Sequence, residues 1–209
     1  MHGMRIGYRD YETADLPHLL RVASGCWGPR FFPGDPRADA DVAVHFVSMF
    51  IGEANRSRVA VCEGIPVGFI LGRITGEPPW SLSARAQAET SAAAVRLRAT
   101  GSCDDYLDFY EKVIGSYMDP LEQAGLALDS ETLLLAVDPG MQGKGIGKGL
   151  LKEMERTMKE AGAADMFLVS TGFSDHGFYT SMGYDRILVS SAAAGRHGTV
   201  GVNYFRKLL

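Results

Sequence analysis

The sequence predicts an α/β protein of the α+β type, in which a mixed, mostly antiparallel sheet of roughly six or seven strands is flanked by helices. Short strand patterns joined by tight turns occur near both ends of the chain, which is typical of antiparallel hairpins. One buried strand leads through a glycine-rich loop into a long amphipathic helix. A helical stretch separates the third predicted strand from the fourth. We therefore expect a single domain over 1–209 with a helical insertion at 75–130.

Composition and charge narrow the function classes. The formal net charge of −4 argues against nucleic acid as a partner. No apolar run is long enough to span a bilayer and the N-terminus has no apolar signal core, so we expect no membrane association and a cytoplasmic location. The cysteines at 26, 62 and 103 are isolated and the histidines are scattered. Neither a disulfide framework nor a metal site is indicated.

The first fifty residues predict a short strand at 5–9 and two helices. Thr13 is expected to be the N-cap of the first helix, and Asp35 with Pro36 starts the second. Between the helices, the glycine- and proline-containing stretch at 25–33 is expected to be a loop rich in large apolar side chains. The buried stripes are predicted to be Leu16, Leu19, Leu20 and Ala23 in the first helix, and Val42, Phe46, Met49 and Phe50 in the second.

A hairpin and the insertion follow. The hairpin has predicted strands at 58–62 and 67–74, joined by a turn. The insertion carries helical patterns at 81–99 and 104–118 and is acidic, with nine acidic residues against four basic ones. A direct connection between two strands would need only a few residues, so this segment is an elaboration of the sheet protein.

The strand, loop and helix between 132 and 162 organise the chain. The apolar run 133–137 is bounded sharply enough to be a buried strand, and Pro139 ends it. Glycines follow at 143, 145, 147 and 149. A helix then shows apolar residues at every fourth position: Ile146, Leu150, Met154 and Met158. Such a loop directs backbone N–H groups and the positive end of a helix dipole at an anion, so it indicates a phosphate site.

Two common phosphate-binding patterns do not fit this loop. The Walker pattern would need a glycine where Asp138 or Gln142 stands, and the dinucleotide pattern would need one where Lys148 stands. What fits is Gln142-x-x-Gly145-x-Gly147 after a strand. A second motif, Phe178-Tyr179-x-x-x-Gly183-Tyr184, follows the strand predicted at 166–171, and two last strands are expected at 186–191 and 199–206.

These two motifs, in this order and on these elements, resemble those of the GCN5-related N-acetyltransferase (GNAT) superfamily. The resemblance implies the acyl-CoA N-acyltransferase fold, whose sheet splays after the strand ending at Val137. It also implies an acetyl-CoA-dependent N-acetyltransferase that acylates a primary amine of a small molecule or peptide by direct attack in a ternary complex. The alternative on the same fold is a noncatalytic acyl-CoA-binding sensor or interaction module.

The resemblance also implies which residues hold acetyl-CoA. Strand residues 135–137 would hold the pantetheine arm as an added strand would, beside a bulge, and the loop at 142–148 would bind the pyrophosphate. The family's asparagine and alanine after the next strand fall at Gly172 and Asp175, so that contact is either absent or supplied by Thr171 or Ser174. The implied cofactor-binding residues are Leu135, Ala136, Val137, Gln142, Gly143, Lys144, Gly145, Ile146, Gly147, Lys148, Thr171, Ser174, Phe178 and Tyr179.

Acyl transfer also requires proton transfer. By resemblance, Tyr179 is the expected proton donor to the sulfur, against the alternative of a core aromatic residue. Glu131 is the candidate base, against the alternative of a solvent-exposed strand end. His176, Asp108 and Glu111 are further candidates for the base.

The sequence leaves three points open. The acceptor is an amine whose identity no motif reveals. The acidic insertion is either a solvated face or a lid that attracts a cationic amine. The protein could be a monomer or a homodimer.

Overall fold

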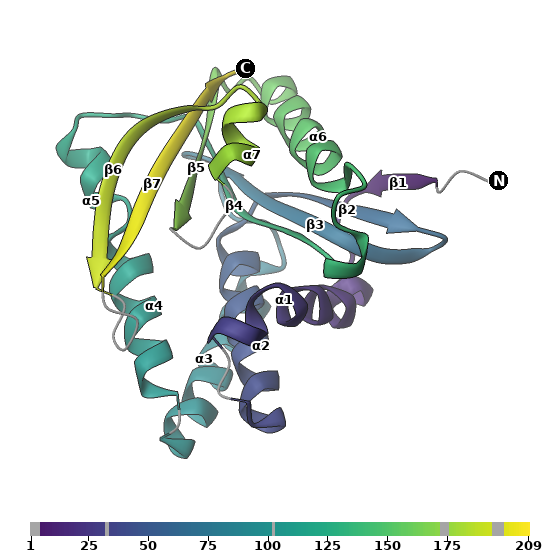
Figure 1. Ribbon diagram of the computed structural model, residues 1–209, viewed down its shortest axis with the longest axis vertical. Coiled ribbons are helices and arrows are strands. Elements are labelled where there is room, and N and C mark those ends of the chain that lie inside the picture. The colour runs from purple at the N-terminus through teal and green to yellow at the C-terminus, as the bar shows by residue number, and fades with distance from the viewer. Residues whose placement is uncertain (1–4, 32–33, 102, 172–175, 194–198) are drawn as a thin grey trace.

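The computed structural model describes residues 5–31, 34–101, 103–171, 176–193 and 199–209. Its strands form a seven-stranded sheet in the order β1-β2-β3-β4-β5-β7-β6 (Figure 1). All neighbouring strands are antiparallel except β4 and β5, which are parallel. The predicted mixed, mostly antiparallel sheet is confirmed. The strands are β1 (Ile6–Arg9), β2 (Arg56–Cys62), β3 (Ile65–Ile74), β4 (Ser130–Val137), β5 (Asp165–Thr171), β6 (Asp185–Ala193) and β7 (Thr199–Leu208).

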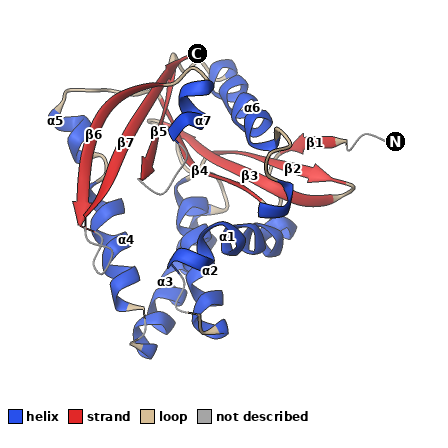
Figure 2. Cartoon of the chain, viewed as in Figure 1, coloured by secondary structure: helices blue, strands red, loops and turns tan. Residues whose placement is uncertain are grey.

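Helices cover both faces of the sheet (Figure 2). The helix α6 lies on one face, and α1 and α2 lie on the other. Three helices, α3 to α5, connect β3 to β4, which is where the sequence predicted a helical insertion. The helices are α1 (Leu16–Phe31), α2 (Pro36–Glu53), α3 (Ser83–Thr100), α4 (Asp104–Ser116), α5 (Asp119–Gln123), α6 (Ile146–Glu160) and α7 (His176–Ser181), with 3-10 turns η1 (Thr13–Asp15) and η2 (Pro139–Met141).

The predicted apolar stripes form the two main cores. In α6 the four residues expected to face the sheet, at 146, 150, 154 and 158, are each at most 1% exposed. They pack with Tyr184, just before β6, and with Phe205 of β7. On the opposite face, Leu19, Val42 and Phe46 pack against β3 and β4. Burial of these stripes holds α6 and α1 on opposite faces of the sheet.

The sheet opens between β4 and β5, as the family resemblance implied. These strands pair only through Glu131 with Phe167 and Thr132 with Leu168. Leu133 forms a bulge against β3, because Leu71 pairs with Leu134 and Gly72 with Thr132. Beyond it, the two strands diverge, and Figure 1 shows β5, β7 and β6 turning away from β1–β4. In the described part of the chain, β4 from Leu133 onward therefore has a strand partner on one side only.

The expected loop at 25–33 is wrong as far as Phe31, because α1 continues to that residue. Tertiary contacts outweigh the poor helix propensity of its glycines and proline. The Trp27 ring lies 4.9 Å from that of Phe46, and the Cys26 thiol donates to the Val137 carbonyl at 3.3 Å. Gly25 permits this approach, since a Cβ there would lie 3.1 Å from the Pro139 ring.

Thr13 is also not the N-cap that the sequence predicted. It lies inside η1, and the buried Asp15 side chain accepts the N–H of Glu12 at 2.9 Å. The Arg9 guanidinium holds the same carboxylate through bonds of 2.6 and 2.7 Å. Glu12 is therefore the N-cap in place of the expected threonine, and Asp15, which is bound to the first strand, accepts its N–H.

Candidate functional site

The glycine-rich loop forms a turn at the N-terminus of α6 whose geometry suits an anion. Gly143 and Gly145 have φ angles of +74° and +81°, which side-chain-bearing residues rarely adopt. The first helical bond runs from the Gly149 N–H to the Gly145 carbonyl at 3.0 Å. The N–H groups of residues 146–148 thus precede the helical ladder, and no acidic residue lies in the first turn. The loop therefore offers backbone donors and a positive dipole end.

Side chains around the loop hold its shape. The Gln142 amide donates to the Val137 carbonyl at 3.1 Å, and the Lys144 ammonium donates to the Gly140 carbonyl at 3.1 Å. Asp138 accepts the Gly140 N–H at 2.9 Å and pairs with Arg21 of α1. The bond from Arg21 is the main reason that the pKa of Asp138 is lowered. In this structure Gln142 and Lys144 contact the loop backbone, while Lys148 lines the groove described next.

A groove of 520 Å³, here called the loop groove, runs from this loop along the open edge of β4. It contains most of the residues that the family resemblance assigned to acetyl-CoA. The described residues that line it are Cys26, Trp27, Leu135, Ala136, Val137, Gln142, Gly143, Gly145, Ile146, Gly147, Lys148, Phe178 and Tyr179.

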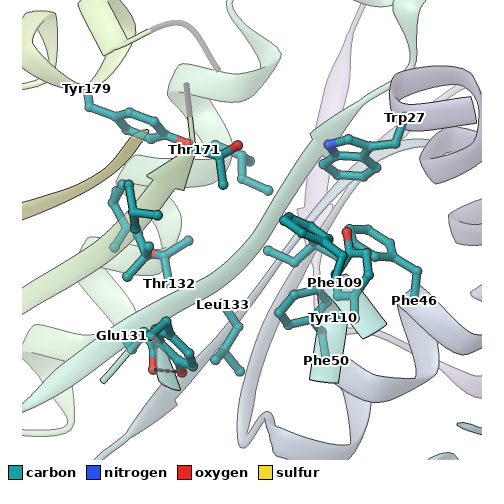
Figure 3. A pocket seen from close by; sticks show the side chains of 16 residues that line it. Trp27, Phe46, Phe50, Phe109, Tyr110, Glu131, Thr132, Leu133, Thr171 and Tyr179 are labelled. Atoms are coloured by element: carbon teal, nitrogen blue, oxygen red, sulfur yellow. Dashed lines mark hydrogen bonds between the residues drawn. The ribbon is translucent and has the colours of Figure 1, made fainter. Parts of the chain in front are cut away.

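The loop groove leads to a second cavity of 170 Å³, here called the inner cavity (Figure 3). Trp27, Leu135 and Tyr179 line both spaces, so they mark the junction. The described residues around the inner cavity are Trp27, Phe46, Phe50, Phe109, Tyr110, Tyr117, Glu131, Thr132, Leu133, Leu134, Leu135, Leu168, Val169, Thr171, Tyr179 and Val202.

Tyr179 reaches the junction from α7. Its ring packs at 5.2 Å from Phe178 and 5.5 Å from Phe205, while Figure 3 shows its hydroxyl end directed toward Thr171 inside the cavity. Tyr179 is thus half-buried, with its ring in the core and its hydroxyl at the cavity. Thr171 lines the inner cavity and not the loop groove. Ser174 and the side chain of His176 lie outside the described residues.

Glu131 lies at the other end of the inner cavity, and the interpretation as a solvent-exposed strand end is wrong. Its side chain is 3% exposed. The Oε2 atom accepts from Arg73 Nε at 2.8 Å and from the Tyr117 hydroxyl at 3.2 Å. Burial raises the pKa of Glu131 to about 7, partly offset by the Arg73 guanidinium. The same burial raises the pKa of Tyr117.

Of the other candidates for the base, Asp108 is exposed and lies 3.8 Å from the Lys112 ammonium. It does not line the inner cavity, and the Glu111 side chain is outside the described residues. Sequence reasoning missed Arg73 and the cavity-lining role of the aromatic residues. The density of aromatic residues at 106–117 and in the stretch 25–33 was the available signal.

The insertion takes part in the inner cavity through α4. Phe109, Tyr110 and Tyr117 line that cavity, whereas the residues found around the loop groove include none from 75–130. Across the described ranges, no group of three metal-ligating side chains could hold an ion. Within the same ranges, no helix has the length and apolar character to cross a membrane.

Comparison with known proteins places this geometry in a family. Residues 103–186 match the family model described as "Acetyltransferase (GNAT) domain". A comparison with curated proteins finds no match. The matched segment contains both motifs identified in the sequence.

Solved structures resemble the whole chain. A protein of Pyrococcus horikoshii OT3 superposes with a TM-score of 0.62 at 15% identity, covering 98% of this chain and 99% of that one. Ribosomal-protein-alanine N-acetyltransferase from Brucella melitensis gives 0.58 at 15% identity, covering 97% and 99%. Polyamine N-acetyltransferase from Drosophila melanogaster gives 0.57 at 16% identity, covering 98% and 100%. At these identities the likeness establishes the fold. Together with the family match over 103–186, it confirms the resemblance to the GNAT superfamily that the two motifs indicated.

Proposed function

We propose that the protein is an acetyl-CoA-dependent N-acetyltransferase that acylates a primary amine by direct attack in a ternary complex. The observation that carries this proposal is the junction at Trp27, Leu135 and Tyr179, where a groove suited to a phosphorylated cofactor meets a second, smaller cavity. Two spaces that meet at one point allow both substrates to be bound together, so no covalent acyl-enzyme is needed.

The residues of the loop groove fit acetyl-CoA. A Cβ built on Gly143 or Gly145 would find nothing within 4 Å, so the backbone at these positions is open to a pyrophosphate. The open edge of β4 at 135–137 can hold the pantetheine arm as an added strand would. The bulge at Leu133 leaves an N–H outside the β3 ladder, which makes it a candidate donor to the acetyl oxygen. When bound, acetyl-CoA supplies the activated acyl group.

Glu131 and Tyr179 each carry out one of the proton transfers that the reaction requires. Glu131, with a pKa of about 7, accepts a proton from the ammonium form of the acceptor, directly or through water. The amine nitrogen then bonds to the acetyl carbon as the carbon–sulfur bond breaks. Tyr179 delivers a proton to the departing sulfur, the second amine proton passes to solvent, and Tyr179 regains its proton from solvent. Their positions at opposite ends of the inner cavity keep the two proton transfers apart (Figure 3).

The alternative is a noncatalytic acyl-CoA sensor on the same fold. Both functions need the loop groove, but only catalysis needs Tyr179 and Glu131 at a cavity connected to it. Thiol release from acetyl-CoA, measured with amines of several classes, separates the two. Tight acetyl-CoA binding by calorimetry with no thiol release for any amine would favour the sensor, and turnover that falls in Tyr179→Phe would favour the enzyme.

A further inference from the structure

The inner cavity has two chemically different sides. Figure 3 shows Thr171, Thr132 and Glu131 of the strands, together with Tyr179 of α7, on one side, here called the strand side, and aromatic side chains of the other helices on the opposite side. The aromatic side chains are Trp27, Phe46, Phe50, Phe109 and Tyr110, from α1, α2 and α4. A molecule that fills this space therefore meets polar groups on one side and aromatic rings on the other.

The aromatic side chains form one continuous wall. Phe46 lies at its centre, with ring centroids 4.9 Å from Trp27, 5.2 Å from Phe50 and 5.4 Å from Tyr110. The rings contact one another, so the wall presents a shared apolar surface. Tyr117 and Tyr179 add two hydroxyl-bearing rings elsewhere in the lining, and the rest of the apolar lining is aliphatic, from residues such as Leu133 and Val202. The wall is suited to an apolar group.

Charge and size limit the ligand further. Among the described residues that line the inner cavity, Glu131 is the only acidic one, and Arg73 is paired with it. The acidic residues of the insertion whose side chains are described lie outside the cavity lining, so they form no lid that would bind a polycation there. The volume is 170 Å³. Since an apolar cavity of about 150 Å³ accommodates benzene, there is room for one six-membered ring.

We infer that the acyl acceptor is a primary amine attached by a short linker to a single aromatic ring. The ring lies against the aromatic wall, and the amine faces the strand side between Glu131 and Tyr179. This inference rests on the proposed function, because it names the acceptor class of the same site. Burying the ring supplies the binding energy, and one carboxylate is enough for one ammonium group.

The test compares kcat/KM for 2-phenylethylamine, tryptamine, putrescine and an alanyl peptide, measured as thiol release from acetyl-CoA. We expect 2-phenylethylamine to exceed putrescine and the peptide by about 10- to 100-fold, the range that corresponds to burying one apolar side-chain-sized group. Equal or better use of putrescine or the peptide would overturn the acceptor class while leaving the proposed function intact. No thiol release with any amine would overturn the proposed function itself.

Variants of the aromatic wall sharpen the test. Phe109→Ala enlarges the cavity, so the ratio of kcat/KM for tryptamine over 2-phenylethylamine should rise about 10-fold or more. Phe109→Leu, a smaller change that keeps the helix packed, should shift the ratio in the same direction. The control is Val95→Ala on α3, where the side chain is 68% exposed and outside the cavity. A ratio unchanged in both Phe109 variants would show that the ring does not bind at this wall and would overturn the inference.

Discussion

Glu131 should make the stability of the protein depend on pH in a direction that is unusual for a carboxylate. In the folded chain, burial raises its pKa to about 7 from the ordinary value of 4.5. Between these two values the folded state binds more protons at this site than the unfolded state. The contribution of Glu131 to stability is therefore fully present below pH 4.5 and is lost as pH rises to about 7.

The magnitude follows from the two pKa values. Their difference corresponds to about 3 kcal/mol in the free energy of unfolding. Because the group is almost fully buried, solvent screening reduces this figure little. Arg73 and Tyr117 remain as hydrogen-bond partners of either protonation state, so the effect should appear as a slope with pH and not as a loss of fold.

The assay is urea unfolding followed by circular dichroism between pH 4.5 and pH 8, for the wild type and for Glu131→Gln. Other titrating groups are shared, so they cancel in the difference between the two curves. The wild type should lose about 3 kcal/mol relative to Glu131→Gln across this range. Glu53→Gln is the matched control: Glu53 also pairs with Arg73 but is 54% exposed, and it is the smallest of the causes that shift the pKa of Glu131, so most of the slope should remain in this variant. Parallel curves for the wild type and Glu131→Gln would refute the reasoning.

Three other substitutions probe the site and its support. Gly147→Glu puts a carboxylate beside the helix N-terminus, so acetyl-CoA binding measured by calorimetry should weaken at least about 100-fold. The control is Gly147→Ala, whose Cβ meets only ordinary contacts at 3.7 Å, and it should fold and bind within about 10-fold of wild type. Equal binding by both variants would exclude the loop as the pyrophosphate site. Tyr179→Phe keeps the ring and removes the hydroxyl, so turnover in the thiol-release assay should fall about 100-fold or more while the affinity for acetyl-CoA stays constant. Full activity would mean that another group protonates the sulfur. Gly149→Ala should lower the free energy of unfolding by about 1–3 kcal/mol, because its Cβ would lie 1.9 Å from the Tyr8 hydroxyl oxygen. This destabilisation should largely disappear when Tyr8→Ala is introduced as well. If the effects of the two substitutions on stability simply add, the two residues do not clash.

Local patterns in the sequence were enough to predict most of the elements and the loop groove. The spacing of residues 146, 150, 154 and 158 predicts the buried face of α6 because helix geometry alone places them on one side. The glycines at 143 and 145 indicate the phosphate loop because few other residues adopt positive φ. Where local preference was weaker than packing, the prediction failed. The clearest case is 25–33, most of which is helical because Trp27 packs on Phe46 across the site.

The inner cavity depended on tertiary structure. Its aromatic wall is formed by residues of α1, α2 and α4, which lie far apart in the chain. The sequence shows that each of these residues is aromatic, but it does not show that they meet around a cavity. The sequence likewise did not determine whether Glu131 is buried, because the first residues of a strand can face either the solvent or the interior. Pairing between β3 and β4 sets Glu131 opposite Arg73, and Tyr117 from the insertion contacts the same carboxylate. Burial of Glu131 in this setting raises its pKa to about 7. The sequence by itself determined the family motifs and the loop proposed to bind a phosphorylated cofactor, because both depend on local backbone conformation. Only the tertiary structure decided the size, lining and electrostatics of the inner cavity, because these depend on which distant side chains exclude water together.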